Sequence, residues 1–444
     1  MKDAGYQIIP KRVMISRLPR VMKDPIPVFA QNLREYGDPY GVDMGRGKLG
    51  ILTTRPEIIR HVLQKNHRNY EKSDIQTKQL ASFLGKGLLT LEGEEWLRQR
   101  RLIQPGFHKQ KIAGLQGLME ATITEQLDHL TTRVKQESVV DIHSEMMNMA
   151  FHVVARSLLG TEIDHQEISR IRESVDASQY MLVRLIRLPF LTWYFKLNGR
   201  LGKAYRLVSE ANEKIMGHVK RRRSSDQEFD DLLDMLLKAR YEDNGEVMSD
   251  QQLLFELMVM FVAGHETSAN ALTWALYLLA QHPEVLAKTR ALSGAEQSTY
   301  LRQVIQEAMR IYPPAWITDR IALADDEVAG IHIPKGALLV SYIYGTHHHP
   351  DIWESPSRFD PDRFNADRIS AHQPFSYLPF GGGPRLCIGM QFALMEMEMV
   401  LRQFIDRFDF EYVGGPVEMK PLVTLNPKGK VDLKLRLKVD EPAG

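Results

Sequence analysis

Cysteine is almost absent from this chain, which carries a single one, Cys387, in 444 residues. One cysteine excludes an internal disulfide framework and is compatible with a reducing compartment, so we expect a cytoplasmic protein. A lone thiolate cannot build a zinc or iron–sulfur site, because those sites need several protein ligands. If Cys387 binds a metal, most of the other ligands must come from outside the polypeptide.

The chain also lacks an excess of one charge, an apolar leader and linker segments. The 57 lysines and arginines nearly balance the 56 aspartates and glutamates, so bulk charge gives no argument for nucleic acid as a partner. Residues 1–10 contain no apolar core of signal-peptide length, so we expect no membrane anchor. The length suggests about three domains, yet no Pro/Gly/Ser-rich or low-complexity stretch separates them.

The stretch Phe380–Gly389 places Cys387 among four glycines, before a segment predicted to be a helix up to about residue 408. Glycines have no Cβ, so this loop can approach a flat macrocycle closely. Haem iron accepts a single protein thiolate, since the porphyrin already supplies four ligands. Arg385 lies two residues before Cys387, so in an extended loop both side chains point to one side, where arginine suits a haem propionate. The alternative for a lone cysteine is a small buried apolar residue.

Phe380, Gly383, Arg385, Cys387 and Gly389 match Phe-x-x-Gly-x-Arg-x-Cys-x-Gly, so the chain resembles the cytochrome P450 family. The resemblance implies the cytochrome P450 fold, which is mainly α with a small β-rich region. It implies a single catalytic domain over residues 1–444, with a β-rich part at about residues 1–70 and a helical bulk at about residues 71–444. It also implies haem b (iron protoporphyrin IX), with Cys387 as the axial ligand of the iron, Phe380 beside the cofactor and O2 as co-substrate.

Three further residues are implied as partners of the haem propionates. Trp96 and Arg100 are four residues apart, hence neighbours on a predicted helix, and they match the Trp-x-x-x-Arg motif of the family. Alone this pair is a weak signal, because tryptophan and arginine at this spacing are frequent on ordinary helices. The segment Tyr312-Pro-Pro cannot be helical. In relatives it leads along the haem edge, which makes Arg320 a propionate candidate.

Residues 249–282 are predicted to form one long buried helix. Ser249-Asp-Gln-Gln252 is a capping-box pattern, and Pro283 follows the last helical residue. A transmembrane reading fails because polar residues, among them Glu256 and Asn270, interrupt the apolar run. The middle of the helix, residues 263–268, reads Ala-Gly-His-Glu-Thr-Ser, which contains several weak helix formers. Such local inconsistency is expected at functional sites.

The segment 263–268 also resembles the Ala/Gly-Gly-x-Asp/Glu-Thr motif of the family, where the helix opens beside the iron to admit dioxygen. The resemblance implies that Ala263 contacts the cofactor, that Thr267 hydrogen-bonds the activated oxygen and that Glu266 helps to relay protons from solvent. His265 stands at the variable position and receives no catalytic role. The alternative for Thr267 is a hydrogen bond to the backbone carbonyl one turn earlier.

Glu307 and Arg310 match the Glu-x-x-Arg pair of the family, which is buried there with a third partner, an arginine. Here Pro361-Asp-Arg-Phe364 supplies Arg363. Exposed residues of this kind would contribute little to stability, so the resemblance implies a buried structural cluster. The consecutive histidines of residues 347–349 point in divergent directions, and we expect them to be structural rather than a metal cluster.

Several other elements follow from apolar periodicity and from proline and glycine positions. We expect a helix at residues 25–36, a hairpin of residues 42–45 and 48–53, a helix from Pro56 to about Lys65, and strands at residues 410–413 and 431–438. Residues 111–240 are almost wholly helical in pattern.

The implied reaction is reductive activation of O2 and insertion of one oxygen atom into a small organic substrate, by hydroxylation or O-dealkylation. Apolar residues such as Val259 and Ile317 favour a hydrophobic substrate, for example a fatty acid or terpenoid, whereas Arg184 and several glutamines permit a more polar one. The candidate pocket residues are Gln76, Gln79, Phe83, Gln179, Val259, Ala315, Ile317 and Thr424.

Two alternatives stay open, a peroxide-driven haem peroxygenase and a non-catalytic haem sensor, and the acid–alcohol pair Glu266-Thr267 argues against both. No flavin or iron–sulfur module remains outside the catalytic domain. The resemblance therefore implies a separate ferredoxin or flavodoxin with its NAD(P)H reductase, which we expect to dock near Arg98, Arg101 or Lys109. We expect a monomer.

Overall fold

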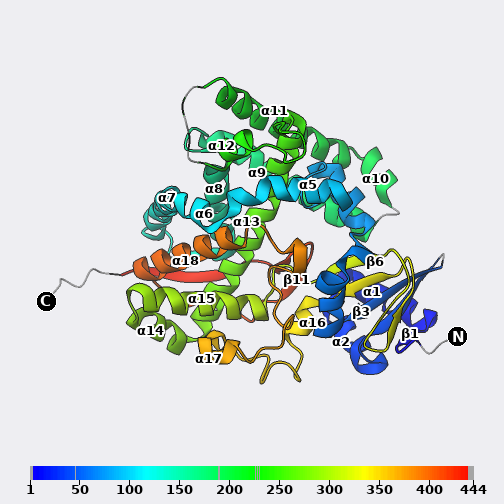
Figure 1. The fold of residues 1–444 in the computed structure, drawn as a ribbon. Helices are drawn as coiled ribbons and strands as arrows, with labels where there is room; N and C mark the ends of the chain where they lie inside the picture. The colour runs from blue at the N-terminus through cyan, green and yellow to red at the C-terminus, as the bar shows by residue number, and fades with distance from the viewer. Residues whose placement is uncertain are drawn as a thin grey trace. The chain divides into compact units, whose positions relative to one another are not determined.

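The computed structural model describes residues 4–45, 47–188, 191–225, 227, 229 and 231–438 (Figure 1). The chain divides into two units, each assembled from three stretches of sequence. Unit 1 comprises residues 1–73, 306–387 and 418–428, and unit 2 comprises residues 74–305, 388–417 and 429–444. Each unit therefore depends on contacts between residues far apart in the sequence.

Unit 1 contains a mixed six-stranded sheet in the order β1-β2-β3-β9-β6-β4. Its central hairpin pairs β2 (Tyr40–Gly45) with β3 (Lys48–Thr53) in antiparallel fashion. β3 also pairs in parallel with β9, which comes from a distant stretch of the chain. The remaining strands of unit 1 are β1 (Gln7–Ile9), β4 (Tyr70–Glu71), β6 (Thr318–Ala322), β7 (Asp326–Val328), β8 (Ile331–Ile333), β9 (Leu338–Ser341), β11 (Met419–Pro421) and β12 (Leu425–Pro427).

The sheet of unit 1 is covered on both faces. Successive side chains of a strand point to opposite faces. Ile51 packs with Ile58 and Leu339 on one face, and Leu52 lies on the other in a cluster that includes Ile26. The helices of unit 1 are α1 (Lys11–Lys23), α2 (Pro25–Tyr36), α3 (Pro56–Arg60), α16 (Ile343–His347) and α17 (Ala366–Ile369), with short helical turns at His61–Lys65, His67–Asn69, Pro361–Phe364 and Gly383–Arg385.

Unit 2 is mainly helical, and α15 (Gly294–Ile311) continues from it into unit 1 at Gln306. Its one small sheet has the order β10-β13-β5 and is antiparallel. Its elements are α4 (Ala81–Leu84), α5 (Gly93–Ile103), α6 (Lys109–Gly114), α7 (Gln116–Val134), β5 (Val139–Asp141), α8 (Ile142–Leu159), α9 (His165–Arg187), α10 (Thr192–Leu197), α11 (Arg200–Arg223), α12 (Leu232–Lys238), α13 (Asp250–Gln281), α14 (Pro283–Ala291), α18 (Met390–Arg407), β10 (Phe408–Tyr412) and β13 (Asp432–Leu437), with short turns at Ile75–Leu80 and Gln104–Phe107.

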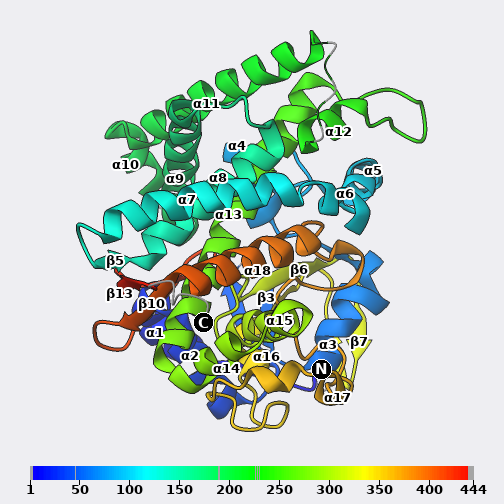
Figure 2. The same ribbon diagram turned by 90° about the vertical axis from the view of Figure 1, so that its left-hand side faces the viewer.

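The helix α13 forms the centre of unit 2. It packs against α8, α11 and α18, which surround it in Figures 1 and 2. Ser249 caps its first turn by accepting a hydrogen bond from the backbone N–H of Gln252. The side chain of Gln252 donates instead to Glu256 and to the carbonyl of Lys86, so the structure shows one half of the expected capping box. Most of the side chains of α13 are buried, as expected of a central helix.

The structure confirms the mainly α fold with small sheets that the sequence predicts. The predicted helix at residues 25–36, the first hairpin and the two C-terminal strands are present. The helix expected at residues 56–65 is a five-residue α-helix followed by a wider helical turn. Within the described part of the chain, no helix has both the length and the apolar character that crossing a membrane requires. The expected single catalytic domain stays a prediction.

Candidate active site

In unit 1, the loop around Cys387 is closed by its own backbone. The backbone N–H of Cys387 donates to the carbonyl of Phe380 at 3.0 Å, and that of Leu386 donates to Gly383, also at 3.0 Å. Gly383 has a φ of +69°, and a Cβ there would lie 1.9 Å from the carbonyl oxygen of Leu63. Only glycine is therefore compatible with this position. The closed loop leaves Cys387 exposed and Phe380 half-buried.

The two arginines of unit 1 expected at the haem lie differently. Arg385 is half-buried in the loop. Arg320, on β6, is only 8% exposed. Its guanidinium donates to the carbonyl of Asp319 at 2.6 Å and to the hydroxyl of Thr318 at 3.4 Å. These local bonds fix the orientation of the Arg320 side chain.

Three expected pocket residues, Ala315, Ile317 and Thr424, come from segments that lie side by side in unit 1. The backbone N–H of Leu425 donates to the carbonyl of Pro314 at 3.0 Å, and the indole of Trp316 donates to the carbonyl of Leu422 at 3.1 Å. Ala315 and Ile317 are half-buried, whereas Thr424 is buried and its hydroxyl accepts a hydrogen bond from Asn426. The structure therefore places these three candidates on two neighbouring segments of unit 1.

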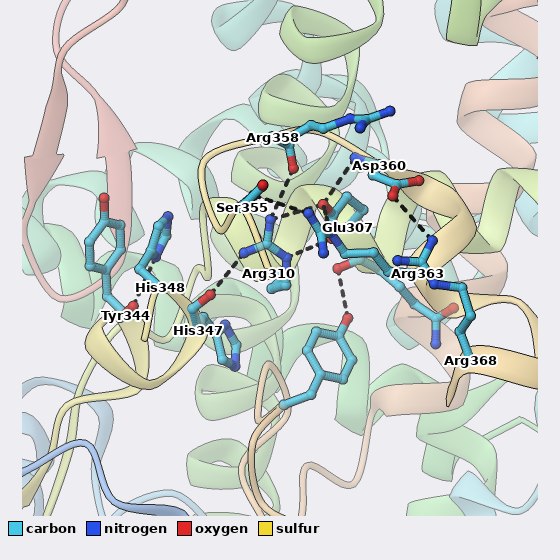
Figure 3. A network of polar contacts seen from close by, with 12 residues as sticks. Glu307, Arg310, Tyr344, His347, His348, Ser355, Arg358, Asp360, Arg363 and Arg368 are labelled. Carbon is cyan, nitrogen blue, oxygen red and sulfur yellow. Dashed lines mark hydrogen bonds and ion pairs between the residues drawn. The ribbon is translucent and has the colours of Figure 1, made fainter. Parts of the chain in front are cut away.

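Glu307, Arg310 and Arg363 meet in the interior of unit 1 (Figure 3). Glu307 and Arg310 are both completely buried, and two nitrogens of Arg310 contact the two carboxylate oxygens at 2.6 and 2.9 Å. Arg363 donates to the same carboxylate at 3.2 Å, and the backbone N–H of Asp360 donates at 3.1 Å. Every oxygen of Glu307 thus has a donor.

The remaining N–H donors of Arg310 and Arg363 form hydrogen bonds to backbone carbonyls. Arg310 also donates to the carbonyls of His347 and Arg358, and Arg363 donates to that of Ser355. His347 itself accepts a hydrogen bond from the backbone N–H of Leu378 at 2.8 Å, just before the Cys387 loop. Burial lowers the pKa of His347 to about 3, so its ring is neutral. The histidine run therefore serves as hydrogen-bonding structure, and no group of three or more metal-binding side chains gathers anywhere in the described residues.

In unit 2, the segment 263–268 lies in an unbroken stretch of α13, so the expected opening of the helix is not seen. The hydroxyl of Thr267 donates to the carbonyl of Ala263 at 2.7 Å, which is the local bond considered as the alternative for this residue. Between Gln252 and Ala280, Ala263 is the one exposed residue, and Thr267, one turn later, is half-buried. This central helix is thus accessible on one side at the very turn that carries the motif.

Glu266 points to a different neighbour. Its carboxylate is 8% exposed and accepts a hydrogen bond of 2.7 Å from the side-chain amide of Gln179 on α9. Gln179 was expected in the substrate pocket, and its contact with Glu266 was not foreseen. His265 is fully buried with its Nδ1 at 2.8 Å from the carbonyl of Phe261. Burial lowers the pKa of His265 to about 4, in keeping with the absence of a catalytic role.

Two other pocket candidates of unit 2, Phe83 and Val259, share one apolar cluster with Met181 and Leu182 of α9. The ring of Phe83 also stacks on Tyr205 at 5.2 Å between centroids. Gln76 and Gln79 lie half-buried on the turn Ile75–Leu80, which packs against α9. The helix α9 therefore connects all five pocket candidates of unit 2, because it carries the fifth, Gln179.

The residues expected at the propionates in unit 2 lie on α5. Trp96 is buried, and Arg100, one turn later, is half-buried with its Nε donating to Gln104 at 3.1 Å. Arg98 is directed elsewhere: two of its nitrogens contact Asp243 at 2.8 and 3.2 Å, and its guanidinium lies 3.8 Å from the ring centre of Tyr241. Arg101 and Lys109 are exposed. Of the three predicted docking cations, Arg98 thus already has an acidic partner.

Sequence reasoning missed Glu396 on α18. This carboxyl group is completely buried, and neither oxygen has a hydrogen-bond partner among the described residues. Burial raises the pKa of Glu396 to about 8, and the nearby hydroxyl of Ser268, which does not reach hydrogen-bonding geometry, opposes this to a smaller extent. The signal in the sequence is a glutamate on the same helical face as the buried Phe392, Met399 and Val400.

The residues present fit a haem. A single exposed thiol on a closed glycine loop suits a metal whose remaining ligands come from a porphyrin, whereas zinc and iron–sulfur sites need several side chains. On α13 of unit 2, Ala263 is exposed and Thr267 is half-buried at the motif. Buried or half-buried Arg320, Arg385, Trp96 and Arg100 are donors that suit carboxylate groups.

Known proteins resemble this chain over most of its length. A family model described as Cytochrome P450 matches residues 12–435. Cyclooctat-9-en-7-ol 5-monooxygenase of Streptomyces melanosporofaciens is 30% identical over 400 residues, which cover 87% of this chain and 85% of the relative. Pentalenene oxygenase of Streptomyces avermitilis is 28% identical over 437 residues, covering 95% of each chain.

Solved structures show the same architecture. A cyanobacterial cytochrome P450 with retinoic acid bound superposes with a TM-score of 0.79 at 26% identity, covering 92% of this chain and 94% of the other. The haem domain of cytochrome P450DA gives a TM-score of 0.82 at 22% identity, covering 94% of each chain. The latter likeness supports the fold.

Proposed function

Because the chain belongs to the cytochrome P450 family, we propose that Cys387 is the thiolate ligand of a haem b iron in an enzyme that oxygenates a hydrophobic small molecule. The chain is a monooxygenase of this family, which uses haem iron and O2. The observation that carries the proposal is the lone cysteine, exposed on a glycine loop whose backbone is closed between Phe380 and Cys387.

The haem, when bound, supplies the iron at which O2 is reduced and one oxygen atom is transferred to the substrate. Cys387 would be the thiolate donor to that iron. By resemblance to the family, Arg385, Arg320, Trp96 and Arg100 would hold the propionates through N–H donors, and Phe380 and Ala263 would contact the macrocycle. Glu307, Arg310 and Arg363 stabilise unit 1, and His347 connects this cluster to the segment before the Cys387 loop.

Proton delivery falls to Thr267 and Glu266. The hydroxyl of Thr267 donates to the carbonyl of Ala263 at 2.7 Å. Its oxygen therefore keeps lone pairs that can accept a hydrogen bond from a proton donor. Rotation about its χ1 angle would break that local bond and leave the hydroxyl able to donate a proton to the reacting oxygen. Glu266 directly precedes Thr267 in the sequence, and its side chain is nearly buried. It is the acid that can carry protons inward. Together they would supply the two protons with which one oxygen atom of O2 leaves as water while the other goes to the substrate.

The substrate is proposed to be an apolar, terpenoid-like molecule. Phe83 and Val259 belong to an apolar cluster in unit 2, and Ile317 packs in an apolar cluster in unit 1. The relatives named for cyclooctat-9-en-7-ol and pentalenene, and the neighbour with bound retinoic acid, point to the same chemistry. Gln76 and Gln79 supply hydrogen bonds to a substrate hydroxyl, which orients such a molecule.

The electrons come from a redox partner, which we propose to be a ferredoxin or flavodoxin with its NAD(P)H reductase. Exposed Arg101 and Lys109 provide positive charge for an acidic donor. The presence of both Glu266 and Thr267 favours this route over a peroxide-driven peroxygenase or a haem sensor, since neither of these needs a proton relay. Monomeric state and cytoplasmic location stay predictions.

The first test is spectroscopic and concerns Cys387. The reduced protein with carbon monoxide is expected to show the red-shifted band of thiolate ligation, and Cys387→Ser is expected to lose it. Titration with pentalenene and with retinoic acid is expected to displace the distal water and shift the haem spectrum. Freshly reduced wild-type protein without the red-shifted band contradicts the thiolate assignment and, with it, the proposed function.

The second test concerns Thr267 and has a matched control. Thr273, on the same helix, makes the same 2.7 Å bond to a carbonyl one turn earlier. Thr267→Ala is expected to lower product formed per reductant consumed by about tenfold or more, because a positioned proton donor contributes on the order of 10²-fold. Thr273→Ala is expected to leave this ratio unchanged. Equal ratios in wild type and Thr267→Ala, or higher turnover with hydrogen peroxide than with reductant, would favour the peroxygenase.

A further inference from the structure

The inference concerns the contact between Gln179 and Glu266, two side chains from different helices of unit 2. Gln179 lies on α9 and Glu266 on α13, and the amide nitrogen of Gln179 donates to the carboxylate at 2.7 Å. Glu266 is 8% exposed, so this bond is largely protected from competing water. A hydrogen bond to a carboxylate in such surroundings is stronger than one between neutral groups.

The partner of Glu266 is a side-chain amide, which is neutral, and this matters for an acid that carries protons. An arginine or lysine would hold the carboxylate ionised, because an opposite charge nearby favours the charged form. The amide of Gln179 donates without bringing a charge and does not ionise near neutral pH. It can therefore fix the direction of the Glu266 carboxylate while leaving the carboxyl able to take up and release a proton.

The same face of α9 also meets the apolar cluster. Gln179 and Leu182 are three residues apart, hence neighbours on one helical face, and Leu182 packs with Phe83 and Val259. The turn that carries Gln76 and Gln79 packs against α9 as well. A displacement of α9 by a molecule bound at these residues would move the amide of Gln179 and with it the orientation of Glu266.

We infer that Gln179 is a positioning residue that aims the Glu266 carboxylate for proton delivery, rather than a part of the substrate-binding wall. This assignment rests on the proposed function, because it presupposes that Glu266 relays protons. In each transfer Glu266 gives up the proton on one carboxyl oxygen and takes another from solvent, and Gln179 keeps its hydrogen bond throughout. No oxidant or reductant takes part in this step.

A double-mutant cycle on the holoenzyme tests the contact without any turnover. Gln179→Leu and Glu266→Leu are each expected to lower the denaturant midpoint, and the second substitution is expected to cost less when the first is present. The coupling should amount to about tenfold in the unfolding equilibrium constant, as for a hydrogen bond to a charged group. Strictly additive effects would show that the contact contributes nothing and would overturn the inference.

A second measurement separates positioning from mere structure. With a ferredoxin and its NADPH reductase and no substrate, Gln179→Leu is expected to enlarge the solvent isotope effect on reductant oxidation. It is also expected to raise the share of electrons recovered as hydrogen peroxide about threefold or more, given an expected tenfold slower proton delivery. Gln179→Glu, which replaces the donor by a second carboxyl group, should shift the pH profile of this share to higher pH.

The control is Tyr180→Phe, the adjacent residue on α9, whose side chain is 49% exposed. It is expected to match the wild type in midpoint, isotope effect and peroxide share. If Gln179→Leu had the wild-type solvent isotope effect and the wild-type peroxide share, the inference would be overturned and the proposed function would stand. A wild-type protein that lacks the thiolate carbon monoxide band would instead refute the proposed function, while the double-mutant cycle still reports on the contact.

Discussion

Glu307 in unit 1 and Glu396 in unit 2 are both completely buried, and their surroundings are opposite. Glu307 accepts hydrogen bonds from Arg310, Arg363 and the backbone of Asp360. Glu396 has no hydrogen-bond partner among the described residues. Both side chains are equally excluded from solvent, so the difference between them lies in whether neighbouring groups compensate the charge of the carboxylate.

The comparison shows two ways of burying an acid. At Glu307 the guanidinium groups offset the cost of removing a charge from water, and the cluster of Glu307, Arg310 and Arg363 bonds to the backbone at His347 and within residues 355–360. At Glu396 no ion pair forms among the described residues, so burial raises its pKa to about 8 and favours the protonated form. The first arrangement resists change, whereas the second responds to pH.

The largest effect is expected from breaking the compensated acid. Arg310→Ala removes two donors from Glu307 and leaves a buried carboxylate with half of its partners, which typically costs about 3–5 kcal/mol. We expect little folded holoprotein and a strongly lowered denaturant midpoint. Arg368→Ala is the control, since Arg368 pairs with Asp360 in the same region but its side chain is 44% exposed. A wild-type midpoint in Arg310→Ala would show that the cluster does not stabilise unit 1.

The next effect concerns the uncompensated acid and depends on pH. The pKa of Glu396 is about 8 in the folded protein, against an ordinary value of 4.5, so between these values folding takes up a proton. The free energy of unfolding therefore falls as pH rises through this window, by up to about 1.4 kcal/mol per pH unit. Glu396→Gln removes this contribution, and the difference in unfolding free energy between variant and wild type should grow from about pH 5 to pH 8.

Glu398→Gln is the matched control for this measurement. Glu398 is on the same helix but bonds to Arg302 at 2.6 Å, so its pairing resembles that of Glu307 in kind. Its variant should follow the wild-type pH profile between about pH 5 and pH 8. Parallel profiles of Glu396→Gln and wild type would mean that Glu396 does not hold its proton in the folded state.

The sequence predicts those parts of this molecule whose determinants are local. The helix α13 and the first hairpin follow from periodicity, a cap and glycines, and the Cys387 loop follows from the lone cysteine and its glycines. The parallel pairing of β3 with β9 was not predicted, because it joins distant stretches and leaves no local pattern. The contact of Gln179 with Glu266 was missed for the same reason.

Glu307 and Glu396 illustrate this limit. Glu307 was predicted with its partners because they stand in short motifs, and the structure brings Glu307, Arg310 and Arg363 together. Glu396 has no charged partner that could have marked it in the sequence. Its only signal is its place among apolar residues on one helical face, and that signal becomes significant once the packing of α18 is known.

The smallest effect is expected at an ion pair that is not buried. Arg98 and Asp243 have side chains 44% and 59% exposed, so water already solvates both charges. Exposed pairs of this kind contribute little to stability, and Arg98→Ala should leave the denaturant midpoint unchanged. If Arg98→Ala lowered the denaturant midpoint as much as Arg310→Ala is expected to, burial would not be what makes an ion pair stabilise this protein.

The same pair also bears on docking of the electron donor. Asp243 offsets the charge of Arg98, whereas Arg101 is exposed on the same helix, so Arg101 contributes more to the potential that attracts an acidic ferredoxin. Arg101→Ala is expected to slow electron transfer at low salt by several-fold, Arg98→Ala by less, and the difference should vanish at high salt. Stopped-flow reduction of the holoenzyme by a ferredoxin at two ionic strengths measures this order, and equal rates for the two variants would contradict it.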